Sequence, residues 1–109
     1  MSKQNEKRAG YIQLQFFDSS SNQVVSLGGA GFATKEEDDA AWANIAVFDG
    51  ESAFLADRLD SEGDIVDEKV ISAETCEQLM GRPIADLINE GRAELKDFLK
   101  SIKRPSHTK

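Results

Sequence analysis

The chain has 109 residues, of which 20 are acidic and 13 basic, and its formal net charge at pH 7 is -7. This acidic balance argues against a general affinity for nucleic acids or anionic membranes. Because 39% of the residues are hydrophobic, the chain can form one modest core, and we expect a single folded domain over residues 1–109.

Both ends of the chain are polar, and we expect flexible tails over residues 1–10 and 103–109. The first tail lacks the apolar stretch of a secretory signal. A single cysteine, Cys76, cannot form an internal disulfide bond. The longest aliphatic and aromatic run, residues 45–48, is far too short for a membrane helix. These features are typical of a cytoplasmic protein that does not bind membranes.

The first predicted elements are two strands joined by a turn. Apolar side chains alternate with glutamines in residues 11–17, which is the period of a half-buried strand. A dense turn signal follows in residues 18–22, and residues 23–32 resume the β pattern. The glycines of residues 28–31 predict a bulge or a bend in this second strand.

The next segment combines a helix signal with β-forming residues. Thr34 and Glu37 have the spacing of a capping box, which predicts a short helix. Residues 42–48 are rich in β-forming side chains and precede a hairpin turn signal, so we expect a strand there. Two further strands, residues 52–59 and 65–71, complete a meander of about five antiparallel strands.

The C-terminal third changes from the strand period to the helix period. Ser72 is placed to cap a short helix that ends at Gly81, and Pro83 is placed to start the next helix. Apolar residues then recur at helical spacing over residues 84–102, with Gly91 on the same stripe. We therefore expect an α+β fold in which an antiparallel meander sheet packs against a C-terminal amphipathic helix.

The acidic residues are concentrated in the middle of the chain. Residues 36–77 contain 14 acidic and 2 basic residues, a balance of -12, whereas the segments on either side are net positive. If the fold gathers these carboxylates on one side, they form a face for a basic partner protein. The alternative is a solvated surface that only keeps the protein soluble. Within the predicted hairpin, the candidate partner-binding residues are Asp57, Asp60, Glu62, Asp64, Asp67 and Glu68.

The register of this hairpin decides which carboxylates meet. A five-residue turn places Asp57 opposite Asp67, which makes the pair a candidate for a raised carboxyl pKa, a cation or a partner's Lys or Arg. The same register sets Arg58 diagonal to Glu68, as an ion pair on an otherwise apolar face. A four-residue turn places Asp57 opposite Val66 instead, and the sequence leaves both registers open.

The sequence contains few residues suited to catalysis or metal binding. The sole histidine, His107, lies near the C-terminus, and Cys76 has acidic neighbours and no positioned histidine. A calcium loop centred on Gly63 would put Arg58 and Lys69 at ligand positions. The glycine-rich run of the second strand lacks a phosphate-loop signature. We therefore expect no metal site and no cofactor, and we favour a protein that is not an enzyme.

Three classes of function are compatible with these patterns. The first is a small acidic interaction module that binds a basic protein surface, as inhibitors, antidotes and nucleic-acid mimics do, and does not bind nucleic acid directly. The second is a small-ligand-binding protein or small enzyme with a pocket between sheet and helix, lined by Tyr11, Trp42, Phe48 and Phe54. The third is a homodimer formed through an edge strand or a helix face. We favour the first class.

Overall fold

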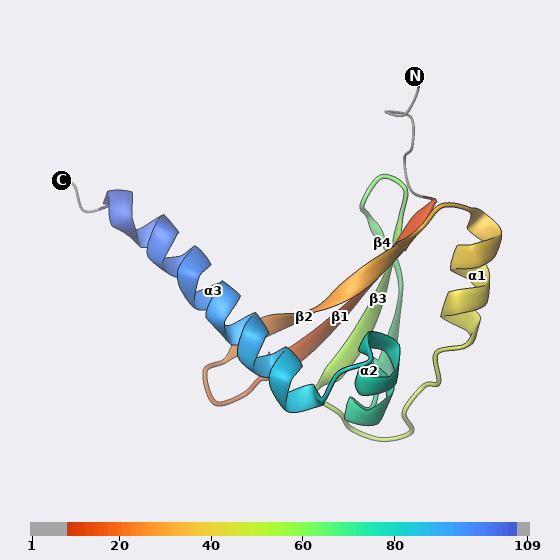
Figure 1. Cartoon of the computed structure of the whole chain (residues 1–109), viewed down its shortest axis with the longest axis horizontal. Coiled ribbons are helices and arrows are strands. Elements are labelled where there is room, and N and C mark those ends of the chain that lie inside the picture. The colour runs from red at the N-terminus through yellow and green to blue at the C-terminus, as the bar shows by residue number, and fades with distance from the viewer. Residues whose placement is uncertain (1–8, 107–109) are drawn as a thin grey trace.

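The computed structural model describes residues 9–106, which form an α+β fold with one antiparallel sheet (Figure 1). The strands lie in the order β2-β1-β3-β4, so β2 and β4 are the two edges. Helix α3 follows the strands along the chain, as the sequence predicts. The elements described are β1 (Gly10–Asp18), β2 (Gln23–Phe32), α1 (Lys35–Ala43), β3 (Phe54–Asp60), β4 (Ile65–Ile71), α2 (Ala73–Met80) and α3 (Ile84–Ser106).

The sheet of the described residues has four strands, so the prediction of about five is wrong in this detail. Residues 42–48, expected to form a strand, instead contain the end of α1, a turn and an irregular segment after it. Trp42 and Ile45 are both buried in the core, and this packing overrides the β preference of the segment. The backbone N–H of Phe48 donates to the carbonyl of Val70 on the edge strand at 2.7 Å.

The β1–β2 hairpin contains the bulge that the glycines predict. Leu14 pairs with Gly28 but Gln15 pairs with Ser26, so Leu27 is the extra residue. Gly28 has φ of 111°, a left-handed conformation that favours glycine. The bulge at the start of the glycine run therefore shifts the pairing of β2 with β1 by one residue, while β2 continues as one strand.

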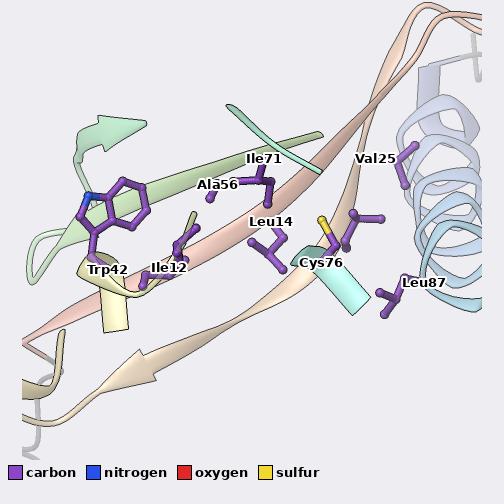
Figure 2. Close-up of a cluster of buried hydrophobic side chains, with 10 residues drawn as sticks. Ile12, Leu14, Val25, Trp42, Ala56, Ile71, Cys76 and Leu87 are labelled. Carbon is purple, nitrogen blue, oxygen red and sulfur yellow. The ribbon is translucent and has the colours of Figure 1, made fainter. Parts of the chain in front are cut away.

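All three helices contribute to one buried cluster on the same face of the sheet, which we call the inner face. Trp42 of α1, Cys76 of α2 and Leu87 of α3 belong to the same cluster as Ile12 and Leu14 of β1 (Figure 2). Alternation along the strands sends the remaining side chains to the opposite, outer face. Within residues 9–106, the outer face has no helix packed on it.

The helix boundaries follow the predicted caps. Thr34 accepts a hydrogen bond from the backbone N–H of Glu37, and Ser72 accepts one from that of Thr75. Gly81 ends α2 with φ of 69°. None of the helices described has an apolar stretch long enough to cross a membrane.

The long helix α3 packs on β2 by its first half only. Gly91 lies against Val25 and Ser26, whereas Phe98 in the second half is 60% exposed. The second half extends away from the sheet (Figure 1). α3 continues to Ser106, and the rest of the expected tails, residues 1–8 and 107–109, lies outside the described residues together with His107. The homodimer predicted from the sequence is not tested by this single chain and stays a prediction.

Candidate functional site

The structure separates the six candidate carboxylates of the β3–β4 hairpin between the two faces and the turn. Asp57 and Glu68 pair across the strands and lie on the outer face. Asp67 lies on the inner face, where its Oδ2 accepts a hydrogen bond of 3.1 Å from Nε1 of Trp42. The hairpin therefore does not present its carboxylates as one surface.

The acidic residues of the turn have a structural role that the sequence analysis did not assign. Oδ1 of Asp60 accepts hydrogen bonds from the backbone N–H groups of Glu62 at 2.9 Å and Asp64 at 3.0 Å. This is the local bonding by which an aspartate stabilises a tight turn. Glu62 and Asp64 are themselves exposed at the end of the hairpin.

The register of the hairpin differs from both predictions. Leu59 pairs with Ile65, as a five-residue turn requires, but a bulge next to this pair puts Arg58 opposite Asp67. Asp57 consequently faces Glu68 and neither Asp67 nor Val66. The bulge also sends Arg58 and Glu68 to opposite faces, so the predicted diagonal ion pair between them is wrong.

Asp57 is the most unusual of these side chains. It sits between Gln13 of β1 and Glu68 of β4 and is only 2% exposed. Its Oδ1 is buried and has no hydrogen-bond partner. Burial and the neighbouring Glu68 raise the pKa of Asp57 above its ordinary value of 3.8. The predicted pair of Asp57 with Asp67 is therefore wrong, and Asp57 faces Glu68 instead.

The pair is reached from the edge of the sheet. Glu68 is exposed and belongs to β4, an edge strand. A cationic group placed beside Glu68 would attract both carboxylates and offset the repulsion between them. A lysine ammonium or an arginine guanidinium has suitable donors, because each carries several N–H groups and a positive charge.

On the inner face, two acidic residues of α1, Asp38 and Asp39, form ion pairs with Arg58. Its Nε and Nη2 donate to Oδ2 of Asp38 at 3.0 and 2.8 Å, and Nη2 also contacts Asp39. Asp38 is 5% exposed, so this is a buried ion pair that holds α1 on the sheet. Hydrogen bonds from Arg58 and Lys35 lower the pKa of Asp39.

The role of Asp38 escaped the sequence analysis, although the sequence holds a signal for it. Asp38 precedes the buried Trp42 by four residues, so both lie on the same face of α1. Arg58 likewise lies on the apolar face of β3. A charged residue on each of two apolar faces is the pattern from which this ion pair could have been inferred.

The aromatic ring of Trp42 is part of the core and of a structural hydrogen-bond network. Nζ of Lys69 donates to the carbonyls of Trp42 at 2.6 Å and Ile45 at 2.9 Å, and lies 4.7 Å from the ring centroid of Trp42. These contacts fix the end of α1 against β4. The predicted use of Trp42 to line a ligand pocket receives no support from this arrangement.

The next features are the single cysteine and the acidic side chains that could bind a metal ion, considered within the described residues. Cys76 is fully buried, and burial raises the pKa of its thiol to about 11. The thiol is therefore protonated at neutral pH and a poor nucleophile. No group of three or more His, Cys, Asp or Glu side chains among the described residues is arranged to bind a metal ion.

Comparison with known proteins adds no family to this description. No model of a protein family matches the sequence, and no curated protein or solved structure is significantly similar to it.

Proposed function

We propose that the protein is an acidic interaction module that binds a basic surface of a partner protein, in the manner of an inhibitor, an antidote or a mimic. The centre of its binding surface is the outer face of the sheet at Asp57 and Glu68. The observation that supports this proposal most directly is the buried Oδ1 of Asp57, which lacks a hydrogen bond although a second carboxylate faces it.

A buried carboxylate beside a like charge is unfavourable for folding. A cationic side chain that binds beside Glu68 offsets the repulsion, because its charge is opposite to that of both carboxylates and its N–H groups donate to the exposed Glu68. The proposed role of Asp57 and Glu68 is therefore to receive a lysine or arginine from the partner.

The surrounding charge favours the same class of partner. The chain carries a net charge of -7, and Asp64 is exposed at the end of the same hairpin. Negative charge near a binding site accelerates the approach of a cationic protein and makes association sensitive to salt. The acids of α1 contribute less to this field, because Arg58 pairs with Asp38 and Asp39.

The experiment compares two variants with equal changes in charge. Asp57→Asn with Glu68→Gln removes the proposed site, and Asp49→Asn with Glu51→Gln removes two exposed acids of the same acidic segment outside the hairpin. Proteins captured from the native cell lysate at about 0.05 M and about 0.5 M salt are identified, and the binding of each purified candidate partner is then measured. Thermal unfolding verifies that both variants are folded.

We expect the Asp57/Glu68 variant to bind a purified partner at least about tenfold more weakly than the Asp49/Glu51 variant, as loss of a desolvated charge pair implies. We also expect association to slow markedly as salt rises. Equal affinity of the two variants, or association that does not respond to salt, would show that the proposed surface is wrong.

A further inference from the structure

An apolar cavity of about 270 Å³ lies between the inner face of the sheet and the helices α1 and α2. Ile12 of β1 and Phe32 of β2 line it from the sheet, Ala41 from α1, and Leu79 and Met80 from α2. Leu79 is 47% exposed, so the cavity reaches the solvent beside α2. The residues that line it carry no charged or polar side chain.

The cavity exists because small residues stand where larger ones would fill the space. Gly29, Ala30 and Ala41 all line it. Ala30 pairs with Ile12 and lies on the inner face, whereas a Cβ at Gly29 would lie on the outer face against the ring of Tyr11. The two alanines, Ala30 and Ala41, therefore leave this part of the cavity open.

We propose that this cavity binds a small, uncharged, apolar molecule of about the size of a bicyclic aromatic ring system. An apolar cavity of about 150 Å³ is large enough to bind benzene. The volume here, about 270 Å³, leaves room for a second fused ring. An entirely apolar lining offers no partner for a buried charge. The acidic first turn of α1, which contains Glu36 and Glu37 one turn before Ala41, further disfavours an anion.

This site is separate from the proposed protein-binding surface. The cavity opens on the inner face, whereas Asp57 and Glu68 lie on the outer face of the same sheet. A ligand in the cavity touches neither carboxylate. Failure of one proposal consequently leaves the other intact.

The chain provides a direct probe of the cavity. It contains two methionines, and Met80 lines the cavity, whereas Met1 belongs to the N-terminal segment outside the described residues. With the methionine methyl groups labelled with carbon-13, the two NMR signals can be followed while naphthalene is added. The ring current of a bound aromatic molecule shifts the signal of Met80, and the signal of Met1 serves as the internal reference.

Two variants of the same helix test the location. Ala41→Leu places a larger side chain in the cavity, and Ala43→Leu makes the same change at an exposed position. Ala30→Leu on β2 is a second filling variant, for use if Ala41→Leu does not fold. The anion 2-naphthoate, which has the same rings, tests the preference for an uncharged ligand.

We expect naphthalene to shift the Met80 signal saturably in the wild type and in Ala43→Leu, and not in a folded cavity-filling variant. We expect 2-naphthoate to bind at least about tenfold more weakly, because a buried carboxylate would have no partner. The proposal is overturned if the Met80 signal of the wild type stays unchanged up to the solubility of naphthalene. It is also overturned if the filled variants bind as well as the wild type, or if 2-naphthoate binds equally well.

Discussion

Asp57 and Glu68 lie directly opposite each other on neighbouring strands, although both are acidic. A pair of like charges in this position costs up to about 1 kcal/mol, and the burial of Asp57 adds to the cost. Stability of the isolated chain does not account for such a pair. Local conflicts of this kind are characteristic of binding sites, where a partner removes the conflict.

Replacement of Asp57 by asparagine should stabilise the protein at neutral pH. The pKa of Asp57 is raised in the folded state, so the folded protein binds the proton more tightly than the unfolded chain. The free energy of unfolding of the wild type therefore falls as pH rises from the ordinary value of 3.8 to the folded-state pKa. We expect Asp57→Asn to raise the free energy of unfolding by up to about 1 kcal/mol at pH 7 and hardly at all near pH 3.5.

Urea titrations of both proteins at the two pH values measure this difference. Glu74→Gln, which removes an exposed carboxylate of α2, is the control and should change stability by less than about 0.5 kcal/mol. A variant Asp57→Asn that is less stable than the wild type at pH 7 would mean that the carboxylate stabilises the fold, and the argument for a strained site would fail.

Arg58 should contribute far more to stability than the exposed Arg82. Replacing Arg58 by methionine leaves the buried carboxylate of Asp38 without its charged partner, which costs roughly 3–5 kcal/mol. The pair of Arg82 with Glu90 is exposed on both sides, so Arg82→Met should cost much less. Chemical unfolding followed by circular dichroism compares the two variants, and similar losses of stability would contradict the buried role of Arg58.

Features set by neighbouring residues in the sequence could be predicted. The β1–β2 hairpin follows from strict alternation and a dense turn, and its bulge from the glycines at the end of β2. The capping of α1 and α2 by Thr34 and Ser72 follows from short-range hydrogen bonding. These elements depend on spacing within a few residues, which a sequence displays directly.

Features set by distant contacts could not be predicted from the sequence. Trp42 belongs to α1 and not to a strand because its ring is buried against the sheet and bonded to Asp67, 25 residues later. The bulge beside Arg58 likewise depends on which face of β3 the helices cover. Local β preference carries no information about either contact.

The candidate site shows the same division. The acidic hairpin and a carboxylate pair that includes Asp57 could be predicted, because charge clustering is visible in the chain. The predicted second member, Asp67, is wrong, since a shift of register by one residue exchanges the two faces of a strand and brings Glu68 opposite Asp57. The apolar cavity depends on how far apart α1 and α2 stand, which no local pattern records.

The thiol of Cys76 should react only when the protein opens. It is fully buried, and burial raises its pKa to about 11, so both access and ionisation limit its reaction at pH 7. We expect labelling by a disulfide reagent to be at least about a hundredfold slower than that of the urea-unfolded chain, and to accelerate with subdenaturing urea. Equal rates in the native and unfolded protein would contradict the burial of α2 against the sheet.

Replacement of Gly91 by alanine should destabilise the protein, although alanine favours an isolated helix by about 1 kcal/mol. A Cβ at this position would lie 2.4 Å from the carbonyl oxygen of Ser26 and from a methyl group of Val25, so α3 must move away from β2. Such overpacking costs about 1–3 kcal/mol. Asn89→Ala, at an exposed position of the same helix, is the control and should be neutral or slightly stabilising. Thermal unfolding of both variants tests whether Gly91 is required for close packing, and a stabilised Gly91→Ala would show that α3 does not approach β2 so closely.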